Sequence, residues 1–307
     1  MKQRLDLIKD LSDILVEEYK KLGIPIQNKD THHLLTGFFN LSDKTISPKR
    51  RTIRISKELN EKNLEEPYNE YLKQIRHKFK YGKNVNTYLS KKAFKPAQKD
   101  PLLYDWGIHH LHLNNEFSPE GFVERSDYLL FCIIKSDTVY FIDVTKHKLD
   151  DRTEFSQQKL LRIVKSNWSH LLEPFKMKGF SSLERKMTDK DYAELRHAGA
   201  MSFVEIDGEV FAMIGGGIST ARTNIKHTIK ADNVFRSLRD MEEHLHQIQK
   251  DLLEINLNTK LPQININYKL IQEGDSFFVI EEKSGNKVIE SKSLYNVIFG
   301  LKDFINN

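Results

Sequence analysis

Three histidines fall within four positions of one short segment, at His109, His110 and His112. In a β-strand, alternate side chains point to opposite faces, so His110 and His112 would share one face and His109 would lie on the other. The two imidazoles of the pair would project side by side, about 6 to 7 Å apart. Histidine is the side chain whose ordinary pKa lies nearest neutrality, so such a pair suits proton transfer or phosphate recognition.

The same pair could bind a metal ion instead. A strand with the pattern His-x-His supplies two zinc ligands, and a catalytic site needs a third protein ligand and an open position. The candidates for that third ligand are Asp105, Asp143 and His147. A third interpretation is structural, with the histidines as amphipathic residues at the edge of a sheet. The spacing matches no known zinc signature, so the site is expected to hold no metal, with His110, His112 and Asp143 as the ligand set if it does.

The next block along the chain resembles a known family. Arg125 precedes the strand-like run Tyr-Leu-Leu-Phe, a short polar turn follows, and a second apolar strand ends in the basic pair His147-Lys148. With the histidine strand included, residues 104–150 are similar to the sheet core of the RelE/ParE-type toxin superfamily, which includes small ribonucleases. Two departures are that residues 149–152 read Leu-Asp-Asp-Arg and that the chain is about three times the size of such toxins. The usual small partner of the toxin is therefore not implied.

The resemblance implies a twisted antiparallel sheet whose concave face holds RNA. Basic and histidine side chains would promote attack of a 2′-hydroxyl on the adjacent phosphate without metal. The matching positions are Arg125, His147 and Lys148, and His110 and His112 are additions outside the family pattern.

The chemistry of RNA cleavage leads to the same residues. The reaction needs a base near the 2′-hydroxyl, an acid near the 5′-oxygen and a cation facing the non-bridging oxygens. The working hypothesis has His110 or His112 as base, His147 as acid and Arg125 as phosphate clamp. No cofactor is expected.

Positive charge is concentrated between Leu41 and Asp100, where 16 Lys/Arg residues occur with 7 Asp/Glu residues. The whole chain carries a net charge of +5, so the remainder is net negative. A basic segment of this kind is typical of proteins that bind a phosphate backbone, although a solvated lysine-rich surface is the alternative. The candidate nucleic-acid-binding residues are Lys49, Arg50, Arg51, Arg54 and Lys148.

The elements that must position these residues can be read from periodicity. Apolar residues at every third or fourth position predict helices over residues 4–22, 66–80 and 153–173. Short aromatic and β-branched runs predict strands of one antiparallel sheet, the last two forming a hairpin. These strands are residues 106–113, 128–135 and 138–144, with a further short strand at 52–55 that has one basic face.

The remainder of the chain predicts a second hairpin, a long helix and a small α/β tail. Asp207-Gly208 is a strong turn signal between residues 200–206 and 210–214. The run Gly215 to Gly217 lacks the lysine of a phosphate loop and predicts a turn with positive φ. Apolar spacing over residues 231–255 predicts a helix whose seam packs internally or forms a homo-oligomer. The tail is residues 277–281, 287–290 and 294–305, read as strand, turn, strand and helix.

We therefore expect a mixed α/β fold of the α+β type, with a twisted antiparallel sheet, flanking helices, a long C-terminal helix and a small tail. Two domains are predicted, 1–180 with the candidate catalytic core and 181–307. The single cysteine, Cys132, lies in an apolar run and predicts a buried thiol in a reducing compartment. No run approaches the roughly 18 apolar residues of a membrane span, so a cytoplasmic location without membrane contact is expected.

The function predicted from these patterns is that of a metal-independent ribonuclease-like effector of the toxin or phage-defence type, with RNA or another nucleic acid as its partner. Two alternatives stay open. A non-enzymatic nucleic-acid-binding protein would need only the basic segment, and a metal-dependent hydrolase would use the His-x-His strand. The patterns do not decide whether the chain is an enzyme.

Overall fold

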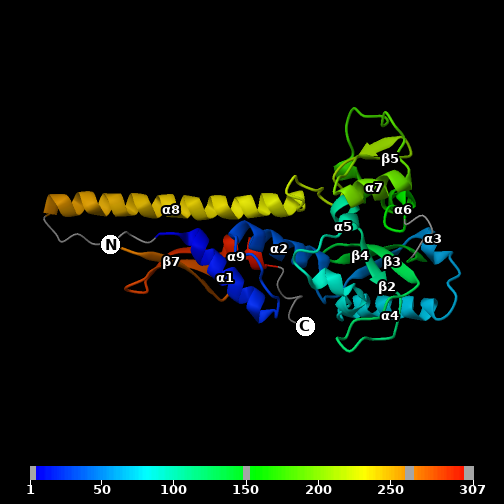
Figure 1. The fold of residues 1–307 in the computed structure, drawn as a ribbon, viewed down its shortest axis with the longest axis horizontal. Helices are drawn as coiled ribbons and strands as arrows, with labels where there is room; N and C mark the ends of the chain where they lie inside the picture. Colours follow the sequence, from blue (N-terminus) through cyan, green and yellow to red (C-terminus); the bar gives the residue numbers. More distant parts are fainter. Residues whose placement is uncertain (1–4, 148–152, 260–265, 301–307) are drawn as a thin grey trace. The chain divides into compact units, whose positions relative to one another are not determined.

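The computed structural model describes residues 5–147, 153–259 and 266–300, and it divides into two compact units (Figure 1). The first unit combines the described residues up to Phe39 with those from His227 onward, and the second runs from Asn40 to Lys226. Both contain helices and sheets, so the predicted mixed α/β class is confirmed.

The first unit packs helices against a three-stranded antiparallel sheet in the order β7-β8-β9. The predicted helix over 4–22 is present, and so are the two strands of the tail and the part of its helix up to Phe299, while residues 301–305 lie outside the described residues. The strand β7 was not predicted. The elements are α1 (Leu7–Lys21), α2 (Thr31–Lys44, up to Phe39), α8 (Ile225–Thr259, from His227), β7 (Tyr268–Glu273), β8 (Ser276–Glu281), β9 (Lys287–Ser291) and α9 (Lys292–Phe299). The residues of α2 after Phe39 belong to the second unit.

The first half of the α8 seam is buried inside this unit. Val234, Leu238 and Leu245 belong to one hydrophobic core with the leucines of α1. Toward the end of α8, Leu252 and Leu253 are partly exposed, at 36% and 38%. The first half of this apolar seam therefore packs inside the unit. Formation of a homo-oligomer through α8 stays a prediction.

The second unit is built on a four-stranded sheet in the order β1-β4-β3-β2. The strands are β1 (Thr52–Ile55), β2 (His109–His112), β3 (Tyr128–Ile134) and β4 (Thr138–Lys146). The three strands β2, β3 and β4 are antiparallel, as predicted, and β1 adds to them in parallel with β4. The histidine strand and the basic strand β1 therefore form opposite edges of the sheet.

Helices cover both faces of this sheet. On one face, Leu129 and Phe131 pack with the apolar side of α6 and with β5 and β6. On the other face, Leu130 and Phe141 pack with α4. These covering elements are α4 (Tyr68–Tyr81), α6 (Gln158–Trp168), α7 (Asp189–Ala198), β5 (Val204–Ile206) and β6 (Glu209–Phe211). The shorter elements are α3 (Lys57–Asn60), η1 (Asn86–Tyr88), η2 (Lys91–Phe94), α5 (Pro101–Trp106), η3 (Ser169–Leu171) and η4 (Glu173–Phe175).

The second predicted hairpin is present as β5 and β6. Asp207 and Gly208 have φ of 50° and 75°, which is the left-handed pair that a tight two-residue hairpin requires. Val204 and Phe211 share a core with Leu160 of α6. The predicted domain boundary near residue 180 thus falls inside the second unit, because this hairpin is packed on elements that precede the boundary.

The glycine run is a close-packed turn. A Cβ on Gly215 would lie 2.2 Å from the Leu103 carbonyl oxygen. The N–H groups of Gly215 and Gly217 donate to the carbonyls of Asp105 and Tyr104, at 2.8 and 2.9 Å. These two N–H groups are engaged with α5, so the run positions α5 as a turn, in agreement with its predicted conformation.

Two further expectations concern exposure. Cys132 is fully buried on β3, and burial raises the pKa of its thiol. This agrees with the predicted buried thiol.

Among the helices that the structure describes, none is long and apolar enough to cross a membrane.

A buried ion pair joins α7 to α5. Arg196 donates from Nε and Nη2 to Asp105 Oδ2, at 2.9 and 2.8 Å, and both side chains are about 5% exposed. The guanidinium also lies 4.0 Å from the centre of the Trp106 ring and donates to the Phe155 carbonyl. Since α5 leads directly into β2, this pair holds the start of the histidine strand.

We expect Arg196→Ala to lower the free energy of unfolding by about 3 to 5 kcal/mol, because it leaves the Asp105 carboxylate buried without its partner. The measurement is urea-induced unfolding followed by fluorescence. Arg185→Ala is the matched control, since Arg185 forms an exposed ion pair with Asp191 and should cost no more than about 1 kcal/mol. Equal decreases in the free energy of unfolding for the two variants would contradict the role of Arg196 in holding α5 against α7.

Candidate functional site

The histidine strand begins at a short capped helix. Asp100 caps α5 by accepting a hydrogen bond from the Leu103 N–H at 3.1 Å, and Pro101 occupies the first turn. Gly107 ends the helix in the left-handed conformation, with φ of 68°. The backbone then enters β2. A proline at the start and a glycine at the end explain why this helix is only six residues long.

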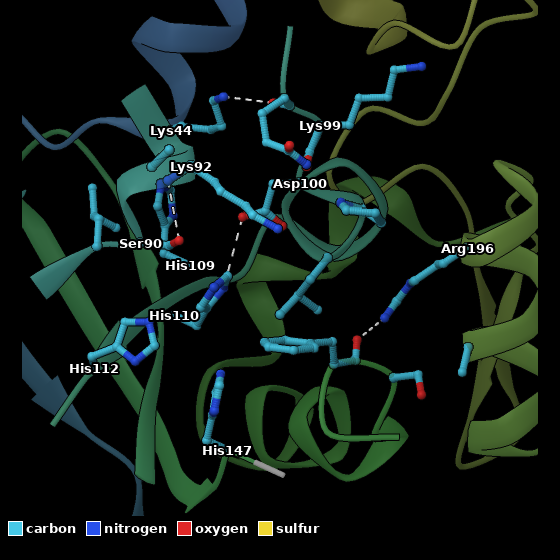
Figure 2. Close-up of a pocket in the computed structure, with 18 of the residues that line it drawn as sticks. Lys44, Ser90, Lys92, Lys99, Asp100, His109, His110, His112, His147 and Arg196 are labelled. Carbon is cyan, nitrogen blue, oxygen red and sulfur yellow. Dashed lines mark hydrogen bonds and ion pairs between the residues drawn. The ribbon is translucent and has the colours of Figure 1, made fainter. Parts of the chain in front are cut away.

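Beside β2 lies a pocket of about 520 Å³ (Figure 2). The structure brings the four predicted catalytic residues together at its wall. His110 and His112 come from β2, His147 directly follows β4, and Arg125 lies in the loop before β3. Residues that are 35 positions apart in the chain therefore meet at one site, and the predicted pairing of His110 with His112 on one side of the strand is present.

His112 is the most buried of the three predicted catalytic histidines, with 5% of its surface exposed. Its ring centre is 5.3 Å from that of His147. Burial lowers the pKa of His112 to about 3, with further lowering by the nearby charges of His110, His147 and Arg125. Its Nδ1 is buried and has no hydrogen-bond partner among the described residues. His112 is therefore a neutral imidazole at neutral pH.

His110 lies between an acidic and an aromatic neighbour. Its Nδ1 is 3.9 Å from Asp100 Oδ2, as the dashed line in Figure 2 marks, and its ring centre is 5.0 Å from that of Phe155. His109 alternates with His110 along β2 but also lines the pocket, with Nε2 3.0 Å from the Asp43 carbonyl oxygen, so the prediction that it lies away from the site is wrong. Burial lowers the pKa of His109.

Several cations of the pocket were not predicted. Lys92 and Lys99 are exposed at its wall, and Lys44 is almost fully buried. The Lys44 ammonium group donates to the carbonyls of Lys95 and Gln98, both at 2.7 Å. Burial lowers the pKa of Lys44 to about 8, against a smaller opposing effect of Asp100. Lys44 lies more than 60 positions from the histidines, and no local sequence pattern signals this contact.

Four of the predicted nucleic-acid-binding residues, those that the structure describes, do not line this pocket. Lys49, Arg50 and Arg54 are exposed, and Arg54 lies on β1, at the opposite edge of the sheet. Arg51 is buried and donates to the carbonyls of Lys135 and Ser47, at 3.0 and 2.8 Å, so its guanidinium is committed to the fold. Lys148 lies outside the described residues.

The structure also separates the predicted metal ligands. Asp143 is fully buried, and its carboxylate forms ion pairs with Lys62 and Lys159 away from His110 and His112. Asp105 is engaged by Arg196. Within residues 5–147, 153–259 and 266–300, no group of three His, Cys, Asp or Glu side chains is arranged to hold a metal ion. Asp143 is thus not available as a third ligand.

No family model, curated protein or solved structure matches this chain. The assignment of a function therefore depends on the geometry of the pocket alone.

The lowered pKa of His112 predicts a pH dependence of stability. Between the unfolded value near 6.5 and the folded value of about 3, the unfolded chain binds a proton that folded His112 does not. Stability therefore falls as the pH falls through this window. When the pH is lowered from 6.5 to 5, we expect the free energy of unfolding of His112→Gln to fall by about 2 kcal/mol less than that of wild type. The basis is about 1.4 kcal/mol for each pH unit.

Chemical denaturation at the two pH values measures this difference. His244→Gln, on an exposed position of α8, controls for loss of an imidazole. The same pH dependence in wild type and His112→Gln would show that His112 is not held in its neutral form.

Proposed function

We propose that the protein is a metal-independent endoribonuclease whose active site is the histidine pocket. The observation that supports this is the convergence of His110, His112, His147 and Arg125 on one cavity. Imidazoles can exchange protons near neutral pH, and a guanidinium matches the geometry of a phosphate. The pocket thus holds the types of group that cleavage through a 2′-hydroxyl requires.

The charge of the pocket favours a phosphodiester. Lys92, Lys99 and Arg125 line it, and Asp100 is the one carboxylate among the described residues of its wall. Because the pocket is partly closed, each positive charge acts on a bound anion more strongly than it would in water. A phosphate group is therefore a better fit than a neutral or cationic ligand.

The proposed reaction uses two histidines. His112 accepts the proton of the 2′-hydroxyl as the 2′-oxygen attacks phosphorus, and His147 donates a proton to the leaving 5′-oxygen. One P–O bond forms and one breaks, which leaves a 2′,3′-cyclic phosphate and a 5′-hydroxyl end. Arg125 stabilises the charge on the non-bridging oxygens, and His110 contacts the same phosphate.

The low pKa of His112 fits the role of base only when substrate is bound. Burial first, and then His110, His147 and Arg125, disfavour a proton on His112. A bound phosphate carries a negative charge that opposes the effect of these cationic groups, so it raises the pKa of His112. Proton transfer from the substrate to His112 is thereby coupled to binding.

The resemblance to RelE/ParE-type toxins implies the same type of reaction. On that basis we extend the proposal to an effector that cleaves cellular or phage RNA. This setting depends on the family resemblance, whereas the reaction depends on the pocket.

We expect purified protein to cleave single-stranded RNA in excess EDTA and to leave 2′,3′-cyclic phosphate ends. His112→Ala and His147→Ala should each lower the rate about 10²- to 10⁴-fold, since each removes a proton-transfer group. The measurement is gel analysis of end-labelled products. His170→Ala is the matched control, because His170 is exposed and does not line the pocket.

Two other results would contradict this proposal. Binding of RNA without cleavage by any of the proteins would identify a nucleic-acid-binding protein. Cleavage that EDTA abolishes and that added Zn²⁺ or Mn²⁺ restores would identify a metal-dependent hydrolase.

A further inference from the structure

A second cavity, of about 430 Å³, adjoins the histidine pocket. The two cavities share Arg125 and His147 as lining residues. The second cavity is also lined by residues at and just before the beginnings of α4 and β3 and at the end of β4, all in the same unit. These are Glu65, Tyr68, Ser126, Asp127, Tyr128 and Lys146. A phosphate held by Arg125 in the proposed active site would therefore have this cavity as its immediate neighbour.

Two tyrosines form an aromatic wall of the second cavity. The ring centres of Tyr68 and Tyr128 are 4.5 Å apart, with the planes inclined at 55°. Both residues are half-buried, so part of each ring remains accessible. Tyr71 packs edge-on against Tyr68 from outside the cavity, at 6.2 Å. Accessible aromatic faces of this kind are the surfaces on which unpaired nucleobases stack.

Two carboxylates make the second cavity unlike the first. Glu65 and Asp127 line it, and the Tyr68 hydroxyl donates to Asp127 at 3.5 Å. Ionised carboxylates only accept hydrogen bonds, so they repel a phosphate and favour a neutral ring with N–H donors. The amino groups of adenine, cytosine and guanine each supply two such N–H donors, whereas uracil has no amino group and supplies only the single N–H at N3. Arg125 and Lys146 also line the cavity and balance the two carboxylates, so it carries no excess of positive charge for a second phosphate. Its tyrosine rings and carboxylate acceptors suit it to a base.

A third cavity, of about 560 Å³, continues from the second, with which it shares Glu65, Tyr68, Tyr128 and Lys146. Lys62 and Lys159 also line it. These two ammonium groups are paired with the single carboxylate of Asp143, so one positive charge is in excess. Along the three cavities, a cationic site, an aromatic site with balanced charges and a second cationic site follow one another. This order suits one nucleotide with its base in the second cavity and the phosphates on its two sides in the first and third.

We propose that the second cavity is a base subsite, in which the nucleotide next to the scissile phosphate stacks on Tyr68 and Tyr128. It accepts single-stranded RNA, because a base within a duplex is not accessible for stacking on a side chain. Bases that carry an amino group bind there more tightly than uracil. This inference rests on the proposed function for the position of the phosphate, and the experiment below separates the two.

The experiment measures binding to an RNA that the proposed reaction cannot cleave. Labelled octamers of 2′-fluoro RNA lack the attacking hydroxyl, and fluorescence anisotropy gives their Kd. We expect Tyr68→Ala and Tyr128→Ala each to weaken binding about 5- to 100-fold, the range for loss of one stacking contact. Tyr68→Phe keeps the ring and should bind like wild type. Wild type should bind adenine, cytosine and guanine octamers more tightly than uracil octamers.

Tyr81→Ala is the matched control, because Tyr81 is also on α4 but is 47% exposed and lines none of the three cavities. Thermal unfolding of every variant checks that it is folded. If an alanine variant does not fold, the phenylalanine variant and the base preference of wild type still test the subsite.

The outcomes distinguish the subsite from the active site. Weaker binding by the alanine variants, with unmodified RNA left uncleaved by wild type, would support the subsite and contradict the ribonuclease. Wild-type Kd values for the alanine variants, with RNA cleaved by wild type, would overturn the subsite and leave the ribonuclease standing. Equal losses for Tyr68→Phe and Tyr68→Ala would also overturn the stacking role, and so would tightest binding to uracil octamers.

Discussion

The buried ion pair between Arg196 and Asp105 is the contact on which the histidine pocket most depends. It fixes α5 against α7, and the Arg196 guanidinium lies over the Trp106 ring. The glycine turn donates two backbone hydrogen bonds to α5. Because α5 passes directly into β2, an error in its placement would move both histidines of the strand. Such a pair adds little net stability compared with apolar packing, but a missing partner is costly, so the arrangement tolerates few alternatives.

The position of β2 at the edge of the sheet explains how one strand can contribute side chains both to the core and to the pocket. Leu111 packs in the core with Leu130, while His110 and His112 alternate with it toward the pocket. An interior strand would have a neighbour on each side, and side chains of both neighbours would surround the imidazoles. The edge leaves room for the pocket, and burial on the other sides gives His112 its low pKa.

Much of this arrangement follows from local patterns in the sequence. The alternation of apolar and polar residues predicted the strands. It also predicted that His110 and His112 share a face, because successive side chains of a strand point to opposite faces. Contacts between distant segments were not predictable in the same way. Lys44 and Arg196 reach the pocket from helices whose periodicity says nothing about what they pack against. Arg51 belonged to a basic cluster in the sequence, yet its guanidinium binds carbonyls in the interior.

The two units differ in how they use the chain, and this bears on the order in which they can form during synthesis. The first unit needs residues before Phe39 and residues after His227, whereas the second is one continuous stretch. Domains generally fold as units while the chain is being made, from the N-terminus onward. The stretch that carries the histidine pocket is therefore complete as soon as Lys226 has left the ribosome. When synthesis has just passed this point, all segments of the pocket have emerged, while the first unit still lacks most of its long helix and all of its sheet.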